Sequence, residues 1–174
     1  MVERPVLLVS ACLCGIACRL DGGHHLHPGV RALRHHFRLV PVCPEQLGGL
    51  ATPRSPAEIT GGGGEEVLEG TARVLTRTGE DVTESFVRGA RQAAAVGEFV
   101  AAAGALLKAR SPSCGVGTTY DGTFTLTLRR GSGVTAALLA RSGLMLWTEE
   151  ELPTIDPLSF AAAFVTSARE SGDT

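Results

Sequence analysis

Three cysteines lie far apart in this chain, and each follows a short apolar run. Cys12 follows residues 6–9, Cys43 follows residues 39–42, and Cys114 comes soon after residues 105–107. Short apolar runs that end near Cys, Gly or Pro are typical of buried strands in a parallel sheet. The loops after the carboxyl ends of such strands share one edge of the sheet. The pattern therefore predicts that the three thiols meet at one point.

Strand and helix patterns alternate along the rest of the chain. We expect strands within residues 5–10, 39–42, 67–76, 104–108, 123–128 and 144–147, helices at 30–36, 83–103, 134–141 and 157–169, and a Pro- and Gly-rich ordered loop at 44–64. This alternation predicts a single α/β domain with a largely parallel sheet and helices on both faces. Residues 1–152 would form its body, with residues 153–174 as a C-terminal helix and tail of the same domain; the full length of 174 residues suits one core.

Composition excludes several classes of partner. The net charge is −2 and aromatic residues make up 5%, so neither a basic surface for nucleic acid or anionic membranes nor a platform for stacking bases is expected. Residues 9–12 resemble a lipoprotein cleavage box, but the acidic start and short apolar stretch suit a secretory segment poorly. The number of cysteines is odd, at five. We therefore expect a protein of the reducing cytoplasm, where free thiols are metal ligands, catalysts or small buried side chains.

The chemically distinctive residues fall in three short motifs. These are Ser-Ala-Cys-Leu-Cys-Gly-Ile-Ala-Cys-Arg at 10–19, Pro-Val-Cys-Pro-Glu at 41–45 continuing to Thr-Pro-Arg at 52–54, and Ser-Pro-Ser-Cys-Gly at 111–115. Glycine lets a backbone approach a ligand closely, and proline stiffens the loop that carries one. Three thiols in such similar settings favour metal binding or cysteine catalysis over packing.

Together and in this order, the three motifs resemble those of the thiouracil desulfidases, a family of small iron–sulfur enzymes once described as a domain of unknown function. The resemblance extends from about residue 6 to residue 152. It implies that Cys12, Cys43 and Cys114 bind a 4Fe-4S cluster and leave one iron without a protein ligand. It also implies that Glu45 in the Cys-Pro-Glu motif and Ser111, the first serine of Ser-Pro-Ser-Cys, are catalytic.

The chemistry of these groups suits the removal of sulfur from a small thiolated heterocycle. An iron without a protein ligand is a Lewis acid, and a soft thiocarbonyl sulfur binds iron well. Glu45 would transfer protons while water replaces sulfur at carbon, and Ser111 would hold the ring or orient that water. Sulfide would be released without net electron transfer. The expected partners are a small thiolated substrate and the iron–sulfur assembly machinery.

Several polar residues near the motifs allow more than one interpretation. Cys18 is a further ligand, a sulfur acceptor or a structural residue. Cys14 stands where the family has a plain apolar residue, so we do not expect it to be a ligand. Lys108 and Arg110 either neutralise the charge of a cluster or remain solvated at the end of a loop.

Five histidines also suggest a metal site, but neighbouring residues cannot point both rings in one direction, and a surface loop is favoured. They are His24, His25, His27, His35 and His36. Two alternatives for the whole chain remain open: a non-catalytic zinc or iron–sulfur binding module, and a metal-free enzyme that transfers sulfur as a persulfide on Cys18 or Cys43. Colour separates a protein that holds an iron–sulfur cluster, which is brown, from a zinc or persulfide protein, which is colourless.

Overall fold

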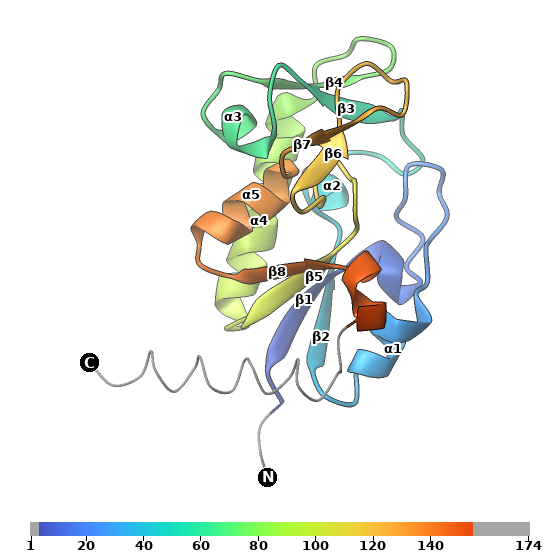
Figure 1. Cartoon of the computed structure of the whole chain (residues 1–174), viewed down its shortest axis with the longest axis vertical. Coiled ribbons are helices and arrows are strands. Elements are labelled where there is room, and N and C mark those ends of the chain that lie inside the picture. The colour runs from blue at the N-terminus through green and yellow to red at the C-terminus, as the bar shows by residue number, and fades with distance from the viewer. Residues whose placement is uncertain (1–3, 155–174) are drawn as a thin grey trace, which may run out of the picture.

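The computed structural model describes residues 4–154, which are built around a four-stranded parallel sheet (Figure 1). Its strand order is β2-β1-β5-β8, with β1 at Val6–Ser10, β2 at Arg38–Val42, β5 at Gly104–Leu107 and β8 at Met145–Thr148. The central strands β1 and β5 are buried along their whole length. Strands covered on both faces read as continuous apolar runs, which is why the sequence pattern identified them. The predicted parallel sheet is confirmed.

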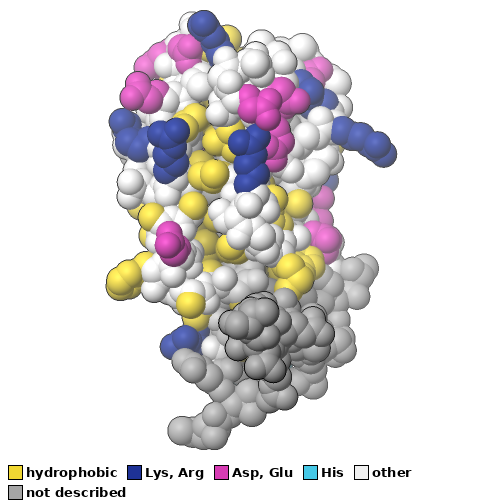
Figure 2. Space-filling model, turned by 90° about the vertical axis from the view of Figure 1, so that its left-hand side faces the viewer, with side chains coloured by type: hydrophobic (Ala, Val, Ile, Leu, Met, Phe, Trp, Pro, Cys, Tyr) yellow, Lys and Arg dark blue, Asp and Glu magenta, His cyan; other side chains and the backbone are white. Residues whose placement is uncertain are grey.

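Helices cover both faces of this sheet, as predicted. On one face α4 (Thr83–Phe99) and α5 (Val134–Arg141) pack over Leu8 and Leu107, and Figure 2 shows hydrophobic side chains along the middle of this side of the molecule. On the other face α1 (Pro28–Leu33) and the 3-10 helices η1 (Ala11–Cys14) and η2 (Glu149–Thr154) pack around Leu7 and Val9. Alternate residues of β1 point to opposite faces, so one strand serves both cores.

Two antiparallel hairpins lie beyond the carboxyl end of the sheet (Figure 1). One joins β3 (Ala57–Thr60) to β4 (Arg73–Thr76), with α3 (Gly64–Leu68) between them, and the other joins β6 (Thr118–Tyr120) to β7 (Leu128–Arg130). Ile59, Val74 and Phe86 form a separate core beneath the first hairpin. The short helix α2 (Pro44–Leu47) begins directly after Cys43. These elements form the walls above the edge where the cysteines lie.

The structure corrects several predicted elements. Residues 44–64 are more regular than a loop, because Pro44 opens α2 and residues 57–60 pair with β4. Residues 67–68 end α3 rather than beginning a strand, and α4 ends at Phe99. Residues 123–127 form a loop: Phe124 and Leu126 have φ angles of 59° and 63°, which an extended strand does not allow. The helix expected at 157–169 lies outside the described residues.

No helix within residues 4–154 combines the length and apolar character needed to span a lipid bilayer.

Candidate active site at the carboxyl edge of the sheet

A cavity of about 540 Å³ opens at the carboxyl ends of β1, β2 and β5, and Cys12, Cys43 and Cys114 all line it. These three strands are neighbours in the sheet. Cys12 lies in η1 directly after β1, Cys43 lies between β2 and α2, and Cys114 lies in the turn after β5. The structure therefore brings together the three thiols that the sequence placed after separate strands.

The Ser-Pro-Ser-Cys-Gly turn holds Cys114 toward the cavity. The Ser111 hydroxyl oxygen accepts hydrogen bonds from the backbone N–H groups of Ser113 and Cys114, each at 3.1 Å. The Gly115 N–H donates to the Ser111 carbonyl at 2.8 Å. A Cβ atom at Gly115 would lie 2.7 Å from the Thr118 carbonyl oxygen, so only glycine fits there. The glycine of this motif thus serves the packing of the turn.

Burial favours the protonated form of the Cys12 and Cys114 thiols in the free protein. It raises the pKa of Cys12 to about 11, an effect that Arg19 partly opposes and the neighbouring Cys43 reinforces. Burial also raises the pKa of Cys114, which Glu45, Cys12 and Cys43 raise further. The three thiols therefore influence one another directly, as neighbouring groups do. Binding of a metal centre would displace their protons.

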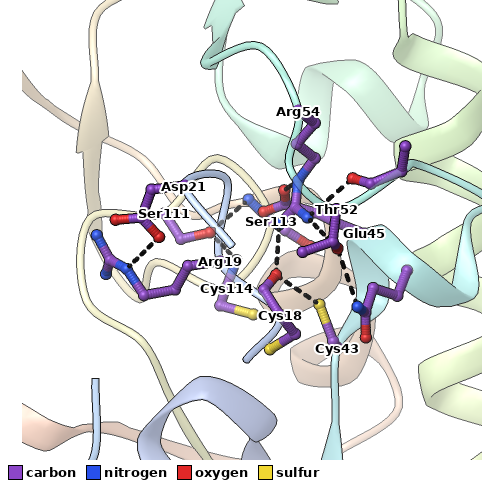
Figure 3. Close-up of polar contacts among 12 residues, drawn as sticks. Cys18, Arg19, Asp21, Cys43, Glu45, Thr52, Arg54, Ser111, Ser113 and Cys114 are labelled. Atoms are coloured by element: carbon purple, nitrogen blue, oxygen red, sulfur yellow. Dashed lines mark hydrogen bonds and ion pairs between the residues drawn. The ribbon is translucent and has the colours of Figure 1, made fainter. Parts of the chain in front are cut away.

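A fourth thiol lies in the same cavity. Cys18 is 2% exposed, and its backbone carbonyl accepts a hydrogen bond from the Cys43 thiol at 3.8 Å. Burial, then the neighbouring Cys43, raises the pKa of Cys18 to about 12. Figure 3 shows Cys18, Cys43 and Cys114 reaching this site from three separate segments. Cys14 packs against the same core as Cys18 and Cys43 but does not line the cavity. Four of the five cysteines thus lie at one site.

Glu45 and Ser111, the candidate catalytic residues, also line the cavity. Glu45 lies in the first turn of α2, where a carboxylate is favoured by the helix dipole. Its Oε2 atom accepts a hydrogen bond from Nε of Arg54, and this ion pair is largely buried: the side chains are 18% and 10% exposed. The Ser111 hydroxyl accepts two backbone hydrogen bonds, so its own proton is directed elsewhere.

The two basic residues after β5 are paired with carboxylates of η2. Lys108 forms an ion pair with the buried Glu149, whose Oε2 also accepts a hydrogen bond from the Ala109 N–H at 2.8 Å. Arg110 forms a more exposed pair with Glu150 at 2.6 Å. Both basic residues line the cavity, and neither is simply solvated. Sequence reasoning missed these acidic partners because they lie about 40 residues further along the chain.

Sequence reasoning also missed two residues of the cavity wall. In the sequence Arg54 stands out only as the last residue of the second motif, although its Nε donates a hydrogen bond to Glu45. Glu58 is 7% exposed, and its Oε2 accepts backbone hydrogen bonds from Gly122 and Phe124, each at 3.0 Å. It thereby fastens the loop at 123–127 over the cavity. The only sign of its role in the sequence is a charged residue in the middle of the short strand β3.

The arrangement does not suit a single metal ion. Within residues 4–154 no three His, Cys, Asp or Glu side chains lie near enough together to hold one ion. Of the histidines, His24, His25 and His35 are exposed, and His25 alone lines the cavity. A polynuclear cluster does not require its cysteines to share one ion, because each binds a different iron.

A sequence model of the 2-thiouracil desulfurase family matches residues 7–151. The chain belongs to the 2-thiouracil desulfurase family. The uncharacterized protein YbbK of Bacillus subtilis (strain 168) is 49% identical over 150 residues, which are 86% of this chain and 99% of YbbK. The solved structure of the 4Fe-4S-dependent thiouracil desulfidase TudS is similar with a TM-score of 0.76 at 40% identity, covering 87% of this chain and 95% of that one. The resemblance carried by the three motifs is confirmed.

The match to the 2-thiouracil desulfurase family covers every residue of the candidate site. It begins within β1 and ends within η2, so it includes the four cavity cysteines, Glu45 and the carboxylates that pair with Lys108 and Arg110. The hairpins that wall the cavity also lie inside it. Every residue of the candidate site therefore lies within the part of the chain that the family model matches.

Proposed function

We propose that this protein removes sulfur from a small thiolated heterocycle such as thiouracil and releases it as sulfide, with a 4Fe-4S cluster and no net electron transfer. One observation carries the proposal: thiols from the loops after three adjacent parallel strands line one cavity together with the partly buried carboxylate of Glu45. Membership of the 2-thiouracil desulfurase family and 40% identity to TudS support it.

The residues of the cavity fit such a cluster. Cys12, Cys43 and Cys114 supply three thiols from rigid loop positions, and the cavity in front of them has room for a further group. Cys14 is not proposed as a ligand because it does not line the cavity, whereas Cys18 lies beside Cys43 as a fourth thiol. When bound, the cluster would supply a Lewis-acidic iron without a protein ligand, a kind of site that suits soft sulfur ligands.

Glu45 is proposed as the residue that moves protons. Its Oε2 is bonded to Arg54, which leaves Oε1 to accept a proton from the water that attacks the thiolated carbon. Glu45 then passes this proton to the departing sulfur, and the second proton of the water follows through the same carboxylate as the C=O bond forms. In sum, a C=S group and one water give a C=O group and hydrogen sulfide, so atoms balance and no electrons are exchanged.

Ser111 is proposed to hold the substrate or the attacking water. Its oxygen already accepts two backbone hydrogen bonds, so its hydroxyl proton is free to be donated into the cavity. A ring nitrogen, a ring carbonyl or the water oxygen would accept it. The same two bonds polarise the hydroxyl and strengthen it as a donor.

Anaerobic reconstitution with iron and sulfide, followed by a sulfide-release assay, tests the proposal. The loaded protein, freed of reductant, should be brown and should convert a thiolated base to its oxo product with equimolar sulfide. A panel of thiolated bases, nucleosides and thioamides defines the substrate. If the loaded protein released sulfide from none of them, the binding-module alternative would be the better account. Activity in a colourless, iron-free protein would favour the persulfide alternative.

We also propose that the protein works in the cytoplasm and receives its cluster from the iron–sulfur assembly machinery. Thiols that are buried, free of disulfides and gathered at one site support this, because such thiols persist in a reducing compartment. Cell fractionation and cluster transfer from a loaded scaffold protein would test both parts.

A further inference from the structure

Arg54 lies in the wall of the cavity and contacts three separate segments of the chain. Its Nε donates to Glu45 Oε2, and its Nη2 donates to the Cys18 carbonyl at 3.0 Å. Its Nη1 donates to Thr52 Oγ1 at 3.2 Å and to the Ala51 carbonyl at 3.3 Å. The side chain is 10% exposed. Each nitrogen of the guanidinium therefore has an acceptor within the protein.

The contact with Glu45 fixes a side chain that its own helix does not fix. The helix α2 is four residues long, and a glutamate has three rotatable bonds. A guanidinium is planar and presents its donors in a fixed fork, so the bonds of Arg54 to Cys18, Thr52 and Ala51 fix the place of the Nε–H that holds Glu45 Oε2. Glu45 is held by Oε2, and Oε1 is the oxygen left for proton exchange.

The contact with Cys18 extends this hold to the thiols. The Cys18 carbonyl accepts hydrogen bonds from both Arg54 Nη2 and the Cys43 thiol (Figure 3). The Arg54 backbone N–H also donates to the Leu20 carbonyl at 2.8 Å, which fixes the same segment. Through this one carbonyl, Arg54 sets where the Glu45 carboxylate stands relative to Cys43.

We propose that Arg54 is a positioning residue that holds the Glu45 carboxylate at a fixed place relative to the cysteine-lined side of the cavity. It touches no reacting atom, and its effect on turnover is exerted through Glu45. The inference rests on the proposed function, because Glu45 is the proposed proton carrier. A lysine at this position would keep the charge but lose the fork that bonds Glu45, Cys18 and Thr52 at once.

Arg88 provides a matched control. Its Nε donates to the Gly48 carbonyl at 3.0 Å, and its Nη2 donates to the same oxygen, so it fastens the other end of α2 to α4. Neither Arg88 nor Gly48 lines the cavity. Arg88→Ala thus removes a guanidinium that supports the same helix without touching Glu45.

The kinetic test compares reconstituted Arg54→Ala, Arg54→Lys, Arg88→Ala and Glu45→Gln, with rates expressed per loaded cluster. Arg54→Ala should lower kcat by about 10- to 100-fold while KM changes less than about threefold, because a displacement of about 1 Å costs this much in rate. Arg54→Lys should recover part of the loss, and Arg88→Ala should keep the wild-type kcat. In the Glu45→Gln background Arg54→Ala should add almost nothing, since residues that act together are not additive.

A crystal structure of each loaded variant gives a readout that does not depend on activity. The Glu45 carboxylate should be displaced by about 1 Å or more in Arg54→Ala and unmoved in Arg88→Ala. Should Arg54→Ala fail to fold or load, the same comparison is made with Arg54→Lys. An unmoved carboxylate, or equal and additive losses from Arg54→Ala and Arg88→Ala, would overturn the proposal. If the wild type acts on no thiolated compound, the proposed function fails, while the displacement still decides whether Arg54 positions Glu45.

Discussion

Two hollows of similar volume lie on different sides of this molecule, and they differ in what lines them. The cavity at the carboxyl edge of the sheet measures about 540 Å³ and gathers four thiols and two buried ion pairs. A groove between α4 and α5 measures about 480 Å³ and is lined mainly by alanine and leucine. Figure 2 shows the side of the molecule where such hydrophobic side chains gather. Volume therefore does not mark the site; converging polar and nucleophilic groups do.

The groove follows from the way α4 packs on the sheet. A Cβ atom at Gly97 would lie 3.1 Å from Leu8 Cδ1, and Ala90 and Ala93 are fully buried. Small residues let α4 approach the strands closely, and they leave the apolar groove between α4 and α5. The edge cavity has a different origin, because loops after parallel strands diverge there. If this contrast is right, substitutions in the cavity should change chemistry and those in the groove should change stability alone.

The largest effect is expected from the cysteines of the cavity. Replacing Cys12, Cys43 or Cys114 by Ala should abolish or sharply reduce iron and sulfide uptake on anaerobic reconstitution, because each removes one of three ligands. Cys14→Ala should leave uptake nearly intact, since that thiol does not line the cavity. Iron content and the visible absorption of the cluster measure this. Equal loss from Cys14→Ala would show that the ligand assignment is wrong.

Glu45→Gln should lower the rate of sulfide release by about 10²–10⁴-fold, the usual cost of losing one positioned acid–base group. The cluster should load normally, because the glutamine has nearly the same shape. Absorption spectra and sulfide assays on the same sample separate the two effects. A fully loaded Glu45→Gln protein that worked at the wild-type rate would remove Glu45 from the mechanism.

In the loaded protein Ser111→Ala should weaken turnover by about 2- to 10-fold, the usual cost of the one hydrogen bond that its hydroxyl is proposed to donate into the cavity. The variant also removes the acceptor of the Ser113 and Cys114 N–H groups, so rates are expressed per loaded cluster. Ser113→Ala is the matched control two residues away. Its hydroxyl bonds Thr135 at 2.8 Å inside the protein and does not line the cavity. That variant should lower stability but keep the rate per loaded cluster. A lower rate per loaded cluster in Ser113→Ala, with no loss in Ser111→Ala, would show that Ser111 is not the serine that contacts the substrate.

The sequence predicted the frame of the site better than its interior contacts. The strands β1 and β5 were recognisable because strands buried on both faces are continuous apolar runs, and each cysteine could be placed from the strand before it. Glu58 could not be placed, because its backbone partners lie 64 and 66 residues away. The strand predicted at 123–128 is wrong over residues 123–127, which form a loop. The alternation of threonine with apolar residues there is typical of a strand, and the sequence does not show that Phe124 and Leu126 have positive φ angles.

In the groove, Leu144→Ala should lower the free energy of unfolding by about 1–2 kcal/mol, because this side chain is only partly buried in the core on the α4 side. Urea unfolding of the cluster-free protein measures the loss. Sulfide release per loaded cluster should stay at the wild-type value. A fall in that rate without a fall in cluster content would show that the two hollows are coupled, and the contrast drawn between them would fail.

The smallest effect is a pH dependence far from the cavity, at the start of α3. The Gly63 N–H donates to Glu66 Oε2 at 2.7 Å, and this bond lowers the pKa of Glu66. Since the folded-state pKa is below the unfolded value of about 4.3, the stabilisation is complete above that value and is lost as pH falls through the folded pKa. Glu66→Gln should therefore be less stable than wild type at pH 7, with the difference shrinking below about pH 4.

Urea unfolding between pH 7 and below pH 4 checks the sign of this difference. The control is Glu84→Gln, which replaces an exposed carboxylate in the first turn of α4. A difference that grew on acidification would mean that the bond to Gly63 does not stabilise the charged form. Sulfide release per loaded cluster should be unchanged in Glu66→Gln, since α3 contributes no residue to the lining of the cavity.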